Sequence, residues 1–261
     1  MQHPSVNQNN KPNLRNLLFT LRYDGSAFHG WQIQHNAVTV QQVFQEAVAK
    51  IIGSCPDIKG CSRTDSGVHA NMFCLSMKTD HPIPCERFMA AVNSHLPMEV
   101  AVTDVREVPL DFHARYNAKG KRYIYKIHNS QVRDPFLRGR ALYYRRPIDV
   151  DKLSRAAKDY IGAHDFTSFC TLDKREAGDF VRTVSDSRVW REGDMVYFSV
   201  TADGFLYNMV RIMVGTLIYI NEGGLPSDAI PSILKACDRS KAGPTAPACG
   251  LYLDEVFYDF K

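Results

Sequence analysis

Apolar and polar residues follow two periodicities along this chain, one typical of strands and one typical of helices. Residues 14–25 (LRNLLFTLRYDG) largely alternate and end in an Asp-Gly pair, which predicts a strand followed by a turn. Residues 39–53 (TVQQVFQEAVAKIIG) instead place their apolar side chains on one helical face. Thr39 and Gln42 have the spacing of a capping box and Gly53 ends the run, so we expect an amphipathic helix there.

The two patterns continue through both halves of the chain. In the first half they predict a strand at 72–78, a helix at 84–96 that Pro84 opens, and a strand at 99–108. In the second half they predict a strand, a helix, a hairpin, two more helices and a closing strand, at residues 121–129, 149–161, 181–203, 206–222, 226–236 and 251–260. Because the two halves have a similar mixed order, we predict an α+β fold of mainly antiparallel sheets backed by helices.

Two similar subdomains with an active-site cleft between them are the expected arrangement. A chain of 261 residues is long enough for one large domain or for two that share a cleft. We predict a disordered tail at 1–13, an N-terminal subdomain at 14–112 and a C-terminal subdomain at 113–261.

The composition is that of an ordinary globular protein, with 44% hydrophobic and 23% charged residues. No stretch approaches the roughly 18 apolar residues that a membrane span needs, and the start of the chain does not have the pattern of a secretory signal, so we expect a cytoplasmic protein. The seven cysteines include no CxxC pair, and the nine histidines include no HxH or HxxxH spacing. The sequence therefore predicts neither a disulfide framework nor a metal site.

Positive charge is concentrated in one segment, residues 106–146. This segment has eleven Lys or Arg against three acidic residues, a net charge of +8, whereas the rest of the chain sums to −4. Seven aromatic residues are interleaved with this charge: Phe112, Tyr116, Tyr123, Tyr125, Phe136, Tyr143 and Tyr144. The mixture is expected where a protein neutralises phosphates and stacks bases, although a solvated strand face with core aromatics has the same composition.

A short turn, GCSRTDSGVHA at residues 60–70, carries a lone carboxylate, Asp65. An Asp between Thr and Ser is commonly a turn or cap residue. Here Gly60 and Gly67 permit an unusual backbone path, and Arg63 supplies a cation nearby. The chain has no GxxxxGK[ST], GxGxxG or GxSxG motif. These features favour an enzyme that uses a carboxylate as nucleophile or general base on a substrate that binds basic and aromatic surface.

At this turn the sequence resembles a known family, tRNA pseudouridine synthase I (the TruA family), whose signature reads close to RTDxGVHA. Four further segments resemble that family in the same order: YDGSAFHGWQIQ (23–34), FHARYNAKGKRYIYKI (112–127), FLYNMVRIMVGTL (205–217) and AGPTAPACGLYL (242–253). The resemblance covers roughly residues 14 to 260. Two small departures are Ser62, where many members have Gly, and Ser66, where many have Ala.

The resemblance implies roles for individual residues. Asp65 would be the essential aspartate and Arg211 its ion-pair partner, whose guanidinium keeps a buried carboxylate charged. Tyr123 would stack on the target uracil and handle a proton, Arg63 would reach into the RNA stem, and Leu253 would form part of the apolar wall. RNA contacts are expected from the basic segment, at Arg115, Lys119, Lys121 and Arg122. Each assignment has a structural alternative: Arg211 as a buried ion-pair partner, Tyr123 as a core side chain, and Asp65 as a turn residue.

The resemblance also implies a reaction and its partners. A tRNA pseudouridine synthase of this kind isomerises uridine at positions 38, 39 or 40 of the anticodon arm, needs no cofactor, and acts as a homodimer with one tRNA touching both subunits. Attack on C1′, attack on C6 and deprotonation at C2′ all stay open as routes. A non-catalytic tRNA-binding or tRNA-folding protein, and an Asp-dependent RNA hydrolase, are the alternative functions.

Overall fold

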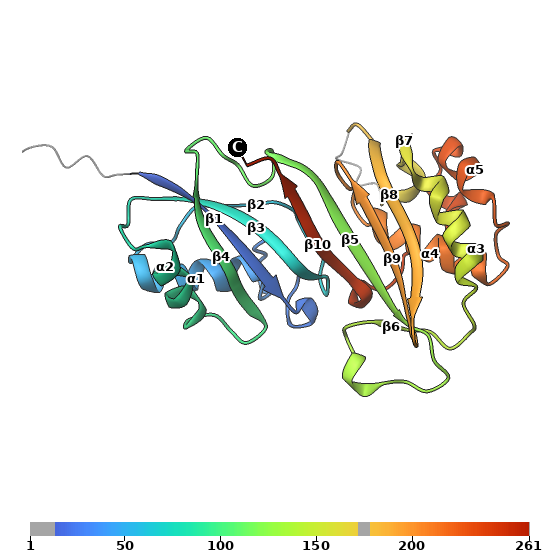
Figure 1. The fold of residues 1–261 in the computed structure, drawn as a ribbon, viewed down its shortest axis with the longest axis horizontal. Coiled ribbons are helices and arrows are strands. Elements are labelled where there is room, and N and C mark those ends of the chain that lie inside the picture. Colours follow the sequence, from blue (N-terminus) through green and yellow to red (C-terminus); the bar gives the residue numbers. More distant parts are fainter. Residues whose placement is uncertain (1–13, 172–177, 261) are drawn as a thin grey trace, which may run out of the picture.

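The structure is a computed structural model, which describes residues 14–171 and 178–260. The tail predicted at 1–13 lies outside the described residues. Within the described residues, ten strands form one sheet in the order β4-β1-β3-β10-β5-β9-β8-β7, with β2 paired to β3 and β6 to β5 (Figure 1). The strands are β1 (Arg15–Tyr23), β2 (Ile58–Gly60), β3 (His69–Thr79), β4 (Val100–Val108), β5 (Ala118–His128), β6 (Leu142–Tyr143), β7 (Gly162–Asp165), β8 (Val181–Glu192), β9 (Met195–Ala202) and β10 (Leu251–Tyr258).

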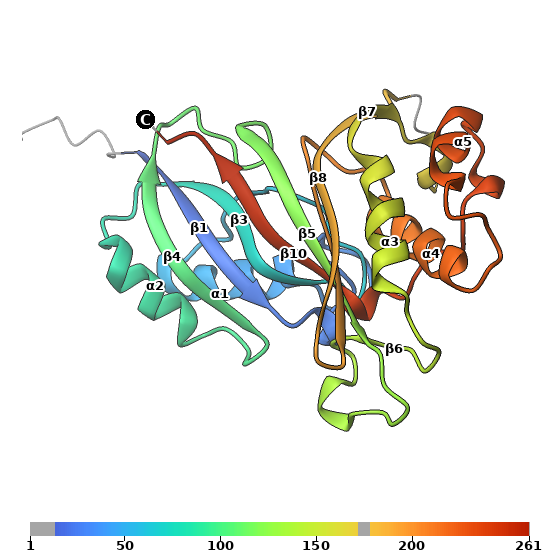
Figure 2. The ribbon, with the colours of Figure 1, turned by 45° about the vertical axis from the view of Figure 1, so that its right-hand side comes forward.

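The predicted α+β class with mainly antiparallel pairing is confirmed, and the two halves share a single continuous sheet. The last strand, β10, joins them, because it pairs parallel with β3 and antiparallel with β5. Figure 2 shows β10 running between these two strands. Its Leu253 lies opposite Tyr123 of β5, and its Tyr252 lies opposite His69 of β3. The strand therefore brings the Tyr123 segment beside the start of β3, which directly follows the Asp65 turn.

The predicted helix at 39–53 is present as α1 (Val40–Ile52). Thr39 caps it by accepting a hydrogen bond from the Gln42 backbone N–H, and Gly53 ends it with a φ of +76°. Helices α1 and α2 (Cys85–Asn93) pack on the β1 side of the sheet, where Phe19 meets aromatic rings from both helices. Helices α3 (Val150–Ala157), α4 (Met209–Asn221) and α5 (Ala229–Ala236) lie together beside β7, β8 and β9 (Figure 1).

The predicted limits of several helices were wrong by a few residues. Helix α4 begins at Met209, inside the predicted range 206–222, because Asn208 has a φ of +62° and helical geometry cannot continue through it. Nine of the thirteen residues of α4 are buried, so this helix runs through the interior. Gly215 permits this, since a Cβ at that position would lie 1.6 Å from the Pro244 carbonyl oxygen. In the part of the chain that the structure describes, no helix has the length and apolar character to cross a bilayer.

Candidate active site

The segment from Tyr23 to Trp31 holds the Asp65 turn in place. The Trp31 backbone N–H donates to the Thr64 carbonyl oxygen at 3.1 Å, and the Gly67 N–H donates to the Phe28 carbonyl oxygen at 3.3 Å. The Tyr23 hydroxyl is hydrogen-bonded to the Thr64 hydroxyl at 2.8 Å. The turn is therefore fixed on both sides of Asp65 by backbone and side-chain bonds.

Glycine is required at one position of the segment from Tyr23 to Trp31 for a steric reason. Gly30 has a φ of +84°, and a Cβ there would lie 2.5 Å from the Thr64 carbonyl oxygen. A larger residue would push the turn away from the segment that supports it. The motif YDGSAFHGWQIQ thus has a structural role, because this segment packs against the Asp65 turn and holds it in place.

Asp65 and Arg211 form an ion pair, as the resemblance to the family implied. The Arg211 Nη1 lies 3.3 Å from the Asp65 Oδ2, and the two side chains are 20% and 26% exposed. Two further bonds orient the guanidinium: its Nε donates to the Ala246 carbonyl oxygen at 2.8 Å, and its Nη1 donates to the Asn208 Oδ1 at 2.7 Å. The carboxylate thus meets a cation whose orientation is already determined by α4 and the segment before β10.

Burial is the largest influence on the acidity of Asp65. It raises the pKa of the Asp65 carboxyl above the ordinary aspartate value, and the charge and hydrogen bond of Arg211 offset only part of that effect. Arg211 therefore limits the rise in the pKa of the Asp65 carboxyl without reversing it. A carboxylate that is partly desolvated and held by one cation is a stronger base and nucleophile than a fully hydrated one.

Asp65 and Tyr123 both line a cavity of about 580 Å³. The Tyr123 side chain is almost fully buried, its hydroxyl lies 3.1 Å from the Ser62 Oγ, and its ring meets Phe205 edge-on with centroids 4.9 Å apart. Burial raises the pKa of the Tyr123 phenol, so the hydroxyl keeps its proton across the neutral range. An aromatic face, a phenol and a carboxylate–guanidinium pair thus share one space that can hold a planar base.

Three predicted RNA-contact residues lie around this cavity. Arg63, Arg115 and Lys121 all line it. Burial lowers the pKa of the Lys121 ammonium, because its side chain lies beside Tyr123 on the inner face of β5. The lining of the cavity therefore includes three cationic side chains.

Two other predicted contacts have carboxylate partners elsewhere. Lys119 lies 3.5 Å from Asp259. Arg122 points to the opposite face of β5, where its Nε lies 2.7 Å from the Asp254 Oδ2 and its Nη2 contacts Glu255. The structure therefore does not bring Arg122 to the cavity.

The apolar wall is formed by β10 and by the segment before α4. Leu253 is fully buried opposite Tyr123, but the β10 residue that lines the cavity is Leu251, two positions earlier on the same face. Sequence reasoning missed Leu251, Phe205 and Asn208. All three lie within the segments that resemble the family, yet only the pairing of β10 with β5 and the left-handed turn at Asn208 show which way they face.

The chain is similar to proteins of one family along most of its length. The family described as tRNA pseudouridine synthase matches residues 20–117 and 156–259. A protein named tRNA pseudouridine synthase A from Moorella thermoacetica is 47% identical over 244 residues, which cover 93% of this chain and 99% of that protein. The protein of the same name from Acetivibrio thermocellus is 44% identical over 245 residues, which cover 94% of this chain and 100% of that protein.

Proposed function

The chain belongs to the tRNA pseudouridine synthase family, whose members are isomerases acting on tRNA uridine, and we propose that it acts on one or more of uridines 38, 39 and 40 of the anticodon arm. The reaction breaks the bond between N1 of uracil and C1′ of ribose, turns the freed base, and joins C5 to C1′. The C5 proton leaves to solvent while N1 gains a proton, so the substrate loses no atom and no electron overall.

Asp65 is the catalytic carboxylate in this proposal. The observation that carries it is the contact between Asp65 and Arg211 within the cavity that also holds Tyr123. Once ionised, Asp65 can attack C1′, attack C6 of the base, or take the C2′ proton. Arg211 orients the carboxylate and stabilises its charge in each route.

Tyr123 receives the target base after it has left the stem. A uridine must leave its stack before a carboxylate can reach the glycosidic bond, which costs a few kcal/mol. Stacking on an aromatic ring returns roughly 1–3 kcal/mol per base, and cationic contacts to phosphate add to this. We assign the stacking surface to Tyr123, the apolar wall to Leu251, and entry into the stem to Arg63. Arg115 and Lys121 are the phosphate contacts at the cavity.

We propose three further properties, of which the resemblance to the family supports the first. The enzyme acts as a homodimer whose subunits share one tRNA, it works in the cytoplasm, and its chain divides into subdomains at 14–112 and 113–261. No cofactor takes part, because the isomerisation is neutral in electrons and atoms.

The test is tritium release from tRNA labelled at uracil C5. The wild type should release tritium, and Asp65→Ala should still bind tRNA but release none. Asp57→Ala is the matched control, since Asp57 is an exposed carboxylate whose ion-pair partner is Lys59. If Asp65→Ala stays active, the catalytic assignment is wrong. Binding by the wild type without any release would favour a tRNA-binding or tRNA-folding protein, and shortened RNA would favour a hydrolase.

A further inference from the structure

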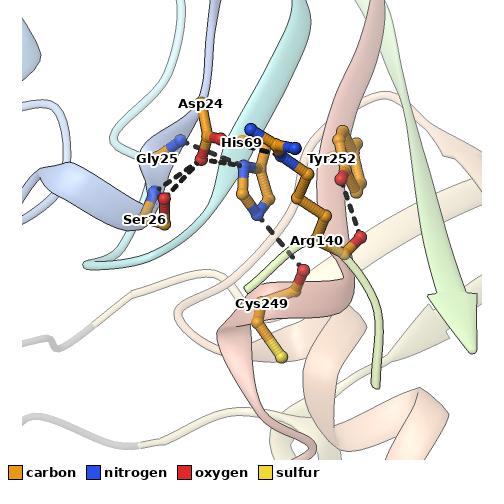
Figure 3. A network of polar contacts seen from close by, with 7 residues as sticks. All are labelled: Asp24, Gly25, Ser26, His69, Arg140, Cys249 and Tyr252. Atoms are coloured by element: carbon orange, nitrogen blue, oxygen red, sulfur yellow. Dashed lines mark hydrogen bonds and ion pairs between the residues drawn. The ribbon is translucent and has the colours of Figure 1, made fainter. Parts of the chain in front are cut away.

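A buried histidine lies at the end of the Asp65 turn and contacts two separate parts of the chain. The His69 Nδ1 accepts a hydrogen bond from the Gly25 backbone N–H at 3.0 Å, and its Nε2 lies 3.2 Å from the Cys249 carbonyl oxygen. Its ring stacks on Tyr252 with centroids 4.5 Å apart (Figure 3). These contacts use both ring nitrogens and one ring face, and none of them belongs to the reaction described above.

The His69 Nδ1 also lies 3.2 Å from the Asp24 Oδ1, and the directions of the other two polar contacts determine the protonation state of the ring. A nitrogen that accepts from an N–H must carry a lone pair, and a nitrogen that bonds to a carbonyl oxygen must carry a proton. His69 is therefore the neutral tautomer with its proton on Nε2. Burial lowers its pKa and Lys126 acts in the same direction, whereas the Asp24 carboxylate opposes them.

The Asp24 carboxylate lies beside the His69 Nδ1 and accepts its hydrogen bonds from other groups. Its Oδ1 accepts from the backbone N–H and the hydroxyl of Ser26, at 3.0 and 2.6 Å. Its Oδ2 accepts from the Arg140 Nε at 3.0 Å. Figure 3 shows this carboxylate between Ser26 and Arg140, at the edge of the imidazole. The segment that contains Gly25 is thereby fixed before it donates to His69.

The connections of His69 reach both partners of the ion pair. Gly25 presses on the Asp65 turn so closely that a Cβ there would lie 2.0 Å from the Val68 carbonyl oxygen, and the Val68 N–H in turn donates to the Asp65 carbonyl. On the other side, Cys249 follows the segment whose Ala246 carbonyl accepts from the Arg211 Nε. The distance between the Asp65 carboxylate and the Arg211 guanidinium therefore depends on the position of the Asp65 turn relative to residues 246–249.

We propose that His69 is a positioning residue for the reaction: its neutral imidazole joins Gly25 to Cys249 and so fixes the Asp65 turn relative to the segment that orients Arg211. This inference rests on the proposed function of Asp65 and assigns no chemical step to His69. A displacement of about 1 Å at a reacting group can lower a rate by about 100-fold, so loss of this connection should appear in kcat. Contacts to tRNA phosphates lie elsewhere and should keep KM unchanged.

The variants His69→Phe and His69→Asn separate position from stability. Phe keeps a ring that can stack on Tyr252 and removes both nitrogens, so kcat for pseudouridine formation should fall at least tenfold with KM within twofold of the wild type. Asn keeps an acceptor near the place of Nδ1 and should recover part of that loss. The matched control is His164→Phe, because His164 bonds one carbonyl oxygen and contacts Phe166 at the far edge of the sheet. Its kcat should equal that of the wild type.

Melting temperatures and a spectroscopic readout complete the test. All assays run well below the lowest melting temperature in the set, and His69→Asn carries the test if His69→Phe does not fold. Nitrogen-15 NMR of the wild type at pH 7 should show His69 with its proton on Nε2 alone. The inference is overturned if His69→Phe keeps the wild-type kcat, or if His69→Asn loses as much kcat as His69→Phe. It is also overturned if the wild-type imidazole carries its proton on Nδ1. A wild type that forms no pseudouridine refutes the proposed function instead, and the NMR result still decides the state of His69.

Discussion

The Asp65 carboxylate is less stable as an anion in the folded protein than in water, because burial raises its pKa more than Arg211 lowers it. A group whose pKa is higher in the folded than in the unfolded chain favours folding when it is protonated. That contribution is complete below the unfolded pKa and is lost as the pH rises through the folded pKa. The ionised Asp65 side chain thus reduces the stability of the enzyme at neutral pH.

Replacement of Asp65 by Asn should show this directly. At pH 7 we expect Asp65→Asn to melt at the same temperature as the wild type or higher, since the amide has no charge to desolvate and can still accept from Arg211. The difference should vanish below the ordinary aspartate pKa, where both side chains are neutral. Thermal melts across pH measure it, and a variant that melts clearly lower at pH 7 contradicts the direction of the pKa shift.

The hydroxyl of Tyr123 is hydrogen-bonded to the Ser62 Oγ. A neutral hydrogen bond contributes about 1 kcal/mol, and Phe205 and the pairing of β5 also hold the ring. Ser62→Ala should therefore slow single-turnover pseudouridine formation by no more than about fivefold. If the phenol only orients the ring, Tyr123→Phe shows the same loss and the double variant adds nothing. A much larger loss in Tyr123→Phe would instead assign the phenol a proton-transfer step.

Strand β5 separates its basic residues onto two faces. Lys121 lies beside Tyr123 at the cavity, whereas Arg122 is bound to Asp254 on the opposite face. We expect Lys121→Ala to weaken tRNA binding and to reduce its salt dependence by about one unit of slope. Arg122→Ala should mainly lower the melting temperature. Binding titrations at several salt concentrations measure both, and an equal loss of affinity in the two variants contradicts this division.

The elements near the site show what local sequence pattern can predict. The alternation in RYIYKI (122–127) predicts that Tyr123 and Tyr125 lie on one face and Arg122 and Lys126 on the other, and β5 has this arrangement because side chains alternate along any strand. It did not indicate which face meets the cavity, since that depends on β10 lying between β3 and β5. The predicted pair of Asp65 and Arg211 is present, but it came from resemblance to a family. No local pattern relates two residues 146 positions apart.

Continuity of the sheet determines the geometry of the whole molecule. The last strand of the chain lies between segments from the first and second halves, so the cavity is complete only after β10 has paired on both sides. Leu253 is fully buried at this junction, directly opposite Tyr123. Local pattern identified β10 as a strand but not its place, because sheet order is set by long-range pairing.

A homodimer is the expected assembly of the enzyme in solution. Sedimentation equilibrium should then give a mass of about twice the 29.5 kDa of one chain. The dimer should persist without RNA, because the proposal has two subunits share one tRNA rather than assemble on it. A monomer at all concentrations, with full activity, contradicts the proposed assembly and leaves the chemistry of Asp65 untouched.

The single-turnover rate of pseudouridine formation by Arg211→Ala tests the central claim most directly. Removal of a preorganised charge-stabilising group commonly slows a reaction by about 100-fold to 1,000-fold. We predict that the rate falls by that factor while the affinity for tRNA is unchanged. Arg211→Lys should recover part of the rate, because it restores the charge but not the hydrogen bond from Nε to the Ala246 carbonyl oxygen. An Arg211→Ala enzyme that is folded and works at the wild-type rate would show that the ion pair is only structural.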